Sequence, residues 1–325
     1  MKRRTVLQLT GAILAAPGLA IAQTPKKYRI GWLSSTTQAG AAVFIQAFLT
    51  GMRERGYVVG ENLILDVRYG EGDSSRFPGL ADELIALKPD VLVGLETVAR
   101  AIVAKTKTIP IVLTTSIDPV AAGLVKSLAR PGTNVTGFVD LYDQLIAKHV
   151  ELMLEVMPKA SRLGLLSDRT WSARERFEQY AQMAASTKKL NLTIAPVANA
   201  TEVEHAFAEF AKKRVEFLVI SATSSLYSHK REIIQNVKRL RLPSIGGIAP
   251  WIEDVGGLLA YGPSLLENHR QLADFGDRIF KGANPGDLPV RQTAKFEFVV
   301  NLKIAREFGI KIPQTILLRA DRVIE

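Results

Sequence analysis

The stretch PDVLVGLETVARAIVAKTKTIPIVLTTS, residues 89–116, alternates two short apolar runs with one helical pattern. Val91–Val93 is short and apolar, which predicts a buried strand, and Ile111–Leu113 has the same character. Between them, Val98–Thr106 has the apolar spacing of a helix. A strand, a helix and a second strand over so few residues predict a βαβ unit, in which the two strands run parallel.

The same alternation extends over the first half of the chain and then begins again near residue 140. In the first half the predicted strands also include Tyr28–Leu33, Leu63–Tyr69 and Val135–Val139, and the predicted helices Ala41–Arg55, Phe77–Leu87 and Pro119–Leu128. In the second half the helices are Gln144–Met157, Ala173–Lys189, Val203–Lys213 and Leu226–Leu240, and the strands Leu163–Leu166, Leu192–Val197, Phe217–Ile220 and Leu258–Tyr261. We therefore predict an α/β protein with two doubly wound, parallel-sheet lobes in succession.

The tail follows a different pattern, with a helix at Leu265–Phe280, a strand candidate at residues 295–301 and a short helix at Leu302–Phe308. A chain of 325 residues is also long for a single core, which favours two lobes. No linker rich in glycine, serine or proline separates the lobes, so we expect a tight hinge between them.

The first 22 residues have the pattern of a secretory signal peptide. Lys2, Arg3 and Arg4 precede an apolar stretch, and a small-x-small site ends at Ala22. We expect cleavage after Ala22 and a periplasmic location. The pair Arg3-Arg4 also fits a twin-arginine signal, so both export routes remain open. Cleavage would remove three basic residues and no acidic one, which lowers the formal net charge from +10 to +7.

The positive charge does not point to nucleic acid. Its densest cluster, HKREIIQNVKRLR at residues 229–241, places charges around an apolar stripe, as on the solvated face of an amphipathic helix. No nucleic-acid recognition motif accompanies it. The chain has no cysteine, which excludes disulfides, thiolate metal sites and thiol nucleophiles, and suits an exported bacterial protein.

The sequence offers no catalytic or cofactor-binding constellation. His149, His205, His229 and His269 lie far apart, and none has a partner at metal-ligand spacing. The nucleophile elbow and the Walker motif are absent, and the turn after the first strand has one glycine where a dinucleotide loop needs three. We predict no enzyme activity, no metal and no cofactor.

Hydroxyl-rich turns recur directly after the predicted strands. In open α/β sheets ligands bind outside the carboxyl ends of the strands, where helix amino termini offer free N–H groups. The same residues also serve as helix caps, so capping alone remains an alternative for each of them. The predicted ligand-binding residues are Ser34, Ser35, Thr36, Glu96, Thr97, Thr115, Ser116, Asp168, Thr223, Ser224 and Trp251.

Several segments resemble a known family. DPVAAGLVKSLARPGTNVTGF (118–138), YGPSLLE (261–267) and KFEFVVNLKIAREFGIKIP (295–313), with LLRADRVIE at the end, are similar to substrate-binding proteins of ABC importers associated with tryptophan- and tyrosine-type ligands. EGDSSRFPGLADELIALKPDVLV (71–93) fits the same family. The resemblance covers essentially the whole chain after the signal segment.

The resemblance implies a type I periplasmic-binding fold, in which two lobes joined by three crossovers close on a ligand. The N-terminal lobe would contain residues 28–139 and about 262–285, and the C-terminal lobe residues 140–261 and about 286–325. It implies a monomeric receptor that captures a small organic ligand, such as an amino acid or an aromatic carboxylate, and delivers it to an ABC permease in the inner membrane.

Two other functions remain open. A ligand sensor of the same fold would signal to a membrane receptor, and an exported α/β enzyme would need a catalytic group that the sequence does not offer. One residue also departs from the family pattern, because Glu96 stands after the third strand where a small residue is usual. Glu96 would either cap the helix that follows or meet the ligand directly.

Overall fold

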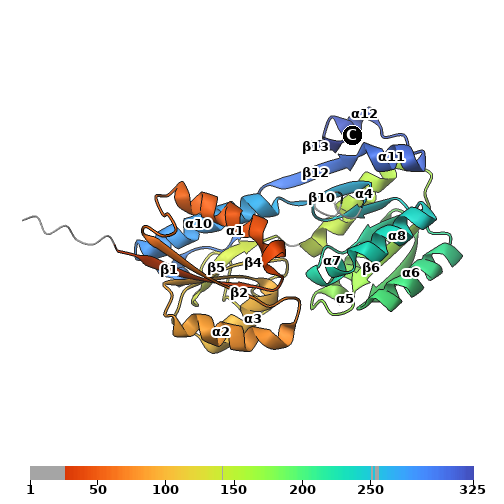
Figure 1. Ribbon diagram of the computed structural model, residues 1–325. Coiled ribbons are helices and arrows are strands. Elements are labelled where there is room, and N and C mark those ends of the chain that lie inside the picture. The colour runs from red at the N-terminus through yellow and green to blue at the C-terminus, as the bar shows by residue number, and fades with distance from the viewer. Residues whose placement is uncertain (1–25, 141, 250–251, 253–255) are drawn as a thin grey trace, which may run out of the picture.

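The computed structural model describes residues 26–140, 142–249, 252 and 256–325, and it divides into two α/β lobes (Figure 1). The predicted signal segment and Trp251 lie outside the described residues. The side chains of Glu96, Thr97 and Ser224 are also outside the described part of the chain. In this part no helix is long and apolar enough to cross a bilayer.

The N-terminal lobe is built on a six-stranded sheet in the order β11-β5-β4-β3-β1-β2, and all of its pairings are parallel. Phe48 and Met52 of one helix and Phe275 of another pack on one face against Ile30 and Trp32. The strands are β1 (Tyr28–Ser34), β2 (Leu63–Tyr69), β3 (Val91–Leu95), β4 (Ile111–Thr115), β5 (Val135–Val139) and β11 (Arg291–Gln292). Helices α1 (Gln38–Arg53) and α10 (Leu265–Phe280) cover that face, and α2 (Phe77–Ala86) and α3 (Glu96–Lys105) cover the other (Figure 1).

The C-terminal lobe has a seven-stranded sheet in the order β13-β12-β10-β9-β8-β6-β7, in which only the β10–β12 pairing is antiparallel among the described strands. The strands are β6 (Arg162–Asp168), β7 (Asn191–Val197), β8 (Phe217–Ile220), β9 (Ser244–Gly246), β10 (Leu259–Pro263), β12 (Phe296–Asn301) and β13 (Arg322–Ile324). Helices α4 (Ile146–Val156) and α5 (Arg174–Thr187) pack on one face, and α6 (Ala200–Lys212) and α8 (Lys230–Leu240) on the other. The short helices are α7 (Ser224–Ser228), α11 (Leu302–Phe308) and α12 (Gln314–Leu317).

The chain crosses between the lobes three times, which confirms the predicted fold class. The first crossover leads from β5 into the 3₁₀ turn η2 (Tyr142–Leu145), the second from β10 into α10, and the third from β11 into β12. The third crossover comes later than we predicted. The turn η3 (Pro285–Asp287) and β11 still belong to the N-terminal lobe, because β11 pairs with β5, so the chain leaves that lobe after Gln292 rather than near residue 286.

The predicted helix at Pro119–Leu128 is wrong. Asp118 Oδ1 accepts from the N–H groups of Val120 and Ala121, as a helix cap would. The turn then fails to propagate, because Leu124 and Val125 both donate to the carbonyl of Pro119. Gly123 has a left-handed φ of 71°, which ends any helical path. Residues 116–134 therefore form a chain of turns.

The predicted helix at Leu226–Leu240 is divided in two. Helix α7 ends at Ser228, and His229 lies between it and α8 with non-helical dihedral angles. The α8 segment keeps the expected amphipathic character, with Ile233 and Val237 buried and its lysines and arginines directed outward.

Candidate functional site

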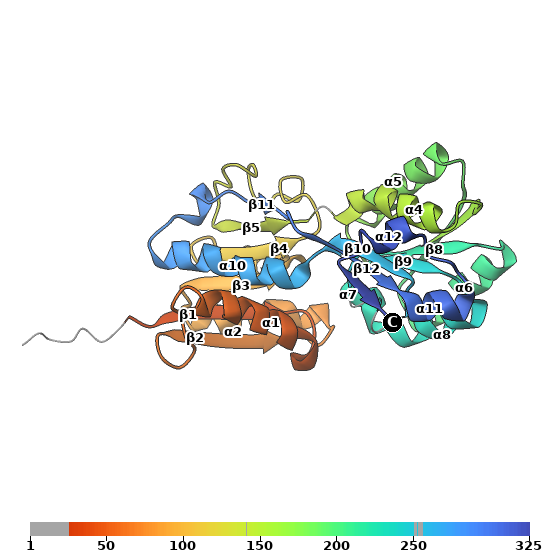
Figure 2. The same cartoon turned by 90° about the horizontal axis from the view of Figure 1, so that it is seen from above.

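The carboxyl ends of the strands in both lobes lie at the edge where the chain crosses between the lobes. Strand β5 ends at the first crossover and runs parallel to β4, which runs parallel to β3, which in turn runs parallel to β1. In the other lobe β10 ends at the second crossover and is parallel to β9, and β8 and β6 follow in the same direction. Figure 2 shows β10 and β12 extending toward the N-terminal lobe. The two sheets therefore direct their carboxyl edges, where open α/β sheets bind ligands, toward a shared boundary.

In the N-terminal lobe the predicted hydroxyls shape the turns at this edge. Ser34 Oγ accepts from the N–H of Thr36 at 3.3 Å, and Ser35 is buried next to it. Thr36 is partly exposed and immediately precedes Thr37, the N-cap of α1. These residues form a compact polar turn at the end of β1, as we predicted from their positions after the strand.

Thr115 has a structural role in its own turn. Its hydroxyl donates to the carbonyl of Ile117 and accepts from the Ile117 N–H, both at 3.2 Å. The residue is only 1% exposed. Thr115 therefore fixes the backbone after β4, and Ser116, which is partly exposed, is the residue of this pair that solvent or a ligand can reach.

In the C-terminal lobe the structure brings two predicted site residues together around Asp168. Asp168 Oδ1 accepts from the N–H and the hydroxyl of Thr170, at 2.8 and 2.7 Å. Asp168 Oδ2 accepts from the hydroxyl of Thr223 at 2.7 Å, which links the ends of β6 and β8. Because Asp168 is 2% exposed and both of its oxygens are engaged, it positions the hydroxyls of this edge rather than offering an open acceptor.

Thr223 also caps α7, since its hydroxyl accepts from the N–H of Leu226 at 3.3 Å. The Thr223 side chain therefore caps a helix and at the same time belongs to the polar cluster around Asp168. For Glu96 and Ser224 the described backbone places each residue at the first position of a helix, α3 and α7 respectively.

An aromatic cluster beside the first crossover was not predicted from the sequence. Tyr142 follows the end of β5 by three residues and is 4% exposed. Its ring stacks on Phe177 with a centroid distance of 5.8 Å and lies 6.2 Å from Trp171, while its hydroxyl donates to the carbonyl of Ile220 at 3.3 Å. Burial raises the pKa of Tyr142, so its hydroxyl keeps its proton and remains a donor. The sequence did offer one signal for this cluster, because Tyr142 lies directly at the predicted boundary between the lobes.

Two further hydroxyls belong to the predicted hydroxyl-rich turns but were not among the predicted ligand-binding residues. Within the described part of the chain, Thr114 Oγ1 at the end of β4 and Ser221 Oγ directly after β8 have no hydrogen-bond partner. Buried polar atoms without a partner are uncommon in native proteins. Both lie at the carboxyl ends of their strands, the edge at which open α/β sheets bind ligands.

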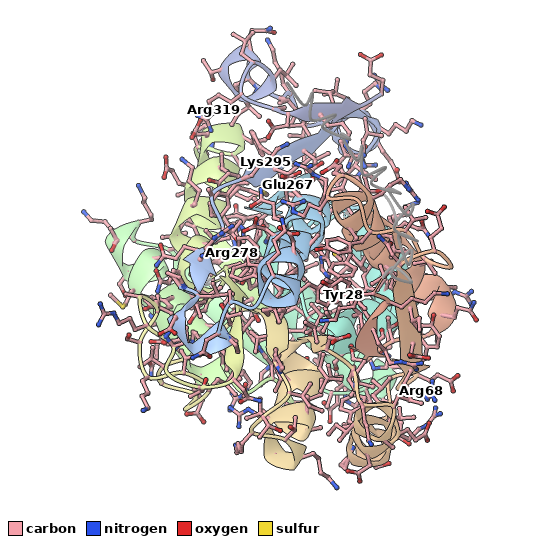
Figure 3. All side chains as sticks on the ribbon, turned by 90° about the vertical axis from the view of Figure 1, so that its left-hand side faces the viewer. Tyr28, Arg68, Glu267, Arg278, Lys295 and Arg319 are labelled. Atoms are coloured by element: carbon pink, nitrogen blue, oxygen red, sulfur yellow. The ribbon has the colours of Figure 1, made fainter. Side chains whose placement is uncertain are left out.

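Charged residues connect the second and third crossovers. Glu267, in the first turn of α10, accepts from Arg270 at 2.8 Å, and Figure 3 shows Lys295 of the third crossover beside it. The hydrogen bond from Arg270 lowers the pKa of Glu267, and the positive charge of Lys295 lowers it further. Arg270 also pairs with Glu54 at 2.6 Å, which fixes α10 to the end of α1.

Gly247 takes part in the two tightest backbone contacts of this site. A Cβ atom there would lie 1.7 Å from Cε2 of Tyr142, and the carbonyl of Gly247 is itself 1.6 Å from where a Cβ on Gly262 would be. The aromatic cluster, the end of β9 and the end of β10 therefore pack with no room for a side chain at Gly247.

Gly247→Ala is expected to lower the free energy of unfolding by about 1–3 kcal/mol, because the buried Tyr142 ring must move. Urea denaturation would measure this loss. Gly79→Ala is the matched control, since Gly79 lies in α2 with nothing within 4 Å of the new methyl, and the same change there should stabilise the helix slightly. In a Tyr142→Ala background, Gly247→Ala should lower the free energy of unfolding by much less than it does in the wild-type protein. An equal loss in both backgrounds would contradict the proposed clash.

No metal-binding group of three His, Asp or Glu side chains occurs in residues 26–140, 142–249, 252 and 256–325. The edge carries hydroxyls, backbone groups and the partly exposed ring of Trp171. These groups can bind and orient a polar organic molecule with an apolar body.

Comparisons with known proteins agree with this geometry. Residues 38–324 match the family described as ABC transporter substrate binding protein. A tyrosine-binding protein of Clostridioides difficile is 26% identical over 259 residues, which cover 79% of this chain and 73% of that protein. A conserved domain protein of Vibrio cholerae has a crystal structure that superposes with a TM-score of 0.84 at 28% identity, covering 92% of this chain and 100% of that one. An ABC domain from Streptococcus pneumonia in complex with L-Trp superposes with a TM-score of 0.83 at 25% identity, with the same coverage. The chain belongs to the ABC transporter substrate-binding protein family.

Proposed function

We propose that this protein is the exported receptor of an ABC importer, which captures a small organic ligand between its lobes and delivers it to a permease in the inner membrane. The observation that carries the proposal is the arrangement of the two sheets, whose carboxyl ends meet at the boundary formed by the three crossovers. Lobes joined in this way close around a ligand by hinge motion.

We assign the ligand to the class of aromatic amino acids and related carboxylates. Two relatives bind tyrosine or L-Trp by their names, and in this chain Tyr142 and Trp171 follow the ends of β5 and β6 with their ring centroids 6.2 Å apart. Hydroxyls and helix amino termini suit a carboxylate, and aromatic rings suit an aromatic body.

The proposed ligand contacts fall into two sets. The set that offers hydroxyls, a carboxylate or an aromatic ring comprises Ser34, Ser35, Thr36, Glu96, Thr97, Ser116, Ser224 and Trp251. Thr115, Asp168 and Thr223 are assigned a positioning role, because their polar atoms are already engaged by neighbouring groups. Export through a signal peptide cleaved after Ala22, and a monomeric state, belong to the same proposal.

The proposal predicts stabilisation by ligand without turnover. A ligand present at about 100 times its dissociation constant adds roughly 2.7 kcal/mol to the free energy of unfolding. A thermal-shift screen of tyrosine, tryptophan, phenylalanine and their α-keto and decarboxylated analogues should find at least one stabiliser, and the decarboxylated analogues should fail.

Two further readouts accompany the screen. Small-angle scattering at saturating ligand should give a smaller radius of gyration, and chromatography should recover the ligand unchanged. Conversion of the stabiliser to a product would replace the receptor proposal with an enzyme. An unchanged radius at demonstrated saturation would contradict closure of the lobes.

A further inference from the structure

Four connecting loops gather at the end of the C-terminal lobe that faces away from the crossovers. The N–H groups of Asn191 and Glu216 donate to the carbonyls of Ser161 and Arg162, and Leu218 donates to Pro243, so the amino ends of the strands lie side by side. We name the surface formed by residues 157–162, 188–190, 212–216 and 241–243 the distal pole. It lies at the carboxyl ends of α4, α5, α6 and α8, with α6 and α8 visible at the outer end of the lobe (Figure 1).

The distal pole carries eight basic residues and one acidic residue. The basic residues are Lys159, Arg162, Lys188, Lys189, Lys212, Lys213, Arg214 and Arg241, and the acidic one is Glu216, which pairs with Arg162 at 3.0 Å. The net charge of the pole is therefore +7, out of +10 for the whole chain, and the first 22 residues hold the other three. Over the remainder of the sequence the formal charges cancel.

Most of these side chains are exposed and lack a counter-charge. Two of the basic residues have a partner outside the pole: Lys213 Nζ lies 3.9 Å from Glu209 Oε1, and the Arg241 guanidinium donates to the backbone carbonyl of Glu307. For the remaining five no ion pair occurs with any residue in the described part of the chain, and all five are exposed: Lys159, Lys188, Lys189, Lys212 and Arg214. The four loops precede the adjacent strands β9, β8, β6 and β7, and neighbouring strands lie only about 4.8 Å apart. Charges on adjacent loops therefore fall within about one Debye length of one another, and their potentials add.

Backbone strain gives a second, independent observation. Lys189, Arg214 and Arg241 have φ angles of 56°, 53° and 47°, three of the five non-glycine residues with positive φ in the described chain. Glycine or asparagine usually occupies this left-handed position after a helix. Attraction to the helix dipole does not explain the choice, because other basic residues already supply it at the end of each helix. Lys188 is the C-cap of α5, Lys212 lies in the last turn of α6, and Lys238 and Arg239 lie in the last turn of α8. Strain maintained at three adjacent loop positions points to a function for the charge.

We propose that the distal pole is a docking surface for an anionic phospholipid bilayer. Protein interfaces are enriched in aromatic residues, methionine and arginine and depleted in lysine, whereas five of the eight basic residues here are lysines. None of the exposed large hydrophobic side chains of the described residues lies in the four loops. Clusters of four to eight lysines and arginines next to a membrane helix or on an amphipathic helix bind anionic membrane surfaces, and the distal pole presents the same number of basic side chains. This assignment rests on the charge and the backbone, and does not depend on the identity of the small-molecule ligand.

The test measures co-sedimentation of the purified protein with sucrose-loaded vesicles. The protein should bind vesicles that mix phosphatidylglycerol with phosphatidylcholine, and binding should decrease steeply as salt is raised. Vesicles of phosphatidylcholine alone should bind at background level.

The decisive variant is Lys189→Gly with Arg214→Gly, which removes two charges and two strained residues together. Each charge near the surface contributes about fivefold to the partition coefficient (~1 kcal/mol), so binding should fall roughly 25-fold. The melting temperature should rise at the same time, which excludes misfolding as the cause. The matched control, Lys107→Gln with Lys126→Gln, removes the same net charge from exposed positions in the N-terminal lobe and should change binding less than about twofold.

Three outcomes would overturn the proposal. The wild-type protein could fail to bind the anionic vesicles, the control variant could lose as much binding as the distal-pole variant, or duplex DNA could compete with the vesicles at equal phosphate and salt concentration. The last result would assign the pole to nucleic acid.

Discussion

Acidification from about pH 6.5 to about pH 4.5 is expected to remove a large part of the stability of this protein, before most carboxylates titrate. Two buried histidines cause the effect. Burial lowers the pKa of His149 to about 4, although the hydrogen bond to the carbonyl of Tyr261 raises it in part. Burial likewise lowers the pKa of His269 to about 4, although the hydrogen bond to the carbonyl of Leu265 raises it in part. Both residues lie on helices that begin at a crossover, α4 and α10.

The geometry of His149 explains why it resists protonation. Its Nε2 lies 2.6 Å from the Tyr261 carbonyl and must donate to it, because a carbonyl only accepts. Its Nδ1 is buried and has no partner in the described part of the chain. A proton on Nδ1 would therefore create a buried charge with an unsatisfied N–H group, which costs several kcal/mol.

The direction of the pH dependence follows from where each state binds protons. An unfolded histidine binds its proton near pH 6.5, whereas the folded residues remain neutral down to about pH 4. Between these values the unfolded state binds more protons, so the free energy of unfolding falls as pH falls and is fully restored above pH 6.5. Each histidine contributes about 3 kcal/mol, and together about 6 kcal/mol, a large share of the ~5–15 kcal/mol typical of a protein.

Urea denaturation at intervals between pH 7 and about 4.5 would measure this slope. The window stops there because Glu216 and Glu267, whose pKa values are lowered from the usual 4.5, add their own acid dependence below it. His149→Gln and His269→Gln should each remove about half of the slope, since glutamine can still donate to the carbonyl. His205→Gln, on the exposed face of α6, is the control and should leave the slope unchanged. A slope unaffected by both buried-site changes would contradict the assignment.

The alternation of strands and helices was predictable from the sequence because it depends on local periodicity. Strand β2 was predicted with its observed bounds, Leu63–Tyr69, and so were β8 and α10. The strands that were missed, β9, β11 and β13, have two or three residues, too few for a periodic pattern. They exist because neighbouring strands pair with them, as β5 does with Arg291–Gln292.

The false helix at Pro119–Leu128 shows the limit of local signals in the other direction. Asp118 and Pro119 are a good helix start, and the small residues after them are compatible with a helix. The backbone instead closes on partners beyond the segment, since Lys126 donates to Pro131 and Gly132 donates to Gly286. Helix propensity reflects only neighbouring residues, so it cannot predict tertiary hydrogen bonds of this kind.

The candidate site also has features that local sequence patterns predict and features that depend on tertiary contacts. The sequence identified the turns that carry the hydroxyls, because these follow predicted strands. It could not separate residues that offer a free donor from those that use it locally, as Thr115 does with Ile117 and Thr223 with Asp168. The Tyr142 cluster joins the first crossover to α5, residues far apart in sequence, so only the packed structure brings it together.

Glu96→Gln is expected to weaken ligand binding by at least tenfold. The backbone places Glu96 at the first position of α3, directly after β3, between β1 and β4 near the middle of the sheet. The ends of those two strands carry Ser34 and Thr115, so Glu96 begins its helix at the centre of the proposed ligand-binding edge. We propose that its carboxylate receives the ammonium group of an amino-acid ligand.

The magnitude follows from the loss of one partner of a buried charge pair. Glutamine keeps the shape of the side chain and removes its charge, which leaves the ligand ammonium without a counter-charge in a closed cleft. Truncating such a pair costs about 2–5 kcal/mol of binding free energy. Because ~1.4 kcal/mol corresponds to a factor of ten, the dissociation constant should rise at least tenfold.

The competing role, capping of α3, predicts a different pair of results. A carboxylate that only interacts with the helix dipole contributes up to about 1 kcal/mol to folding and nothing to affinity. Glu202→Gln provides that comparison, because Glu202 lies in the first turn of α6 and accepts from the N–H of Ala198 at 2.7 Å.

Calorimetric titration with the best ligand from the thermal-shift screen, together with urea denaturation of both variants, separates the two roles. Glu96→Gln should lose affinity and little stability, and Glu202→Gln should lose a little stability and no affinity. A change of less than about threefold in the dissociation constant for Glu96→Gln, under ~0.7 kcal/mol, would remove Glu96 from the ligand contacts and leave it as a helix cap.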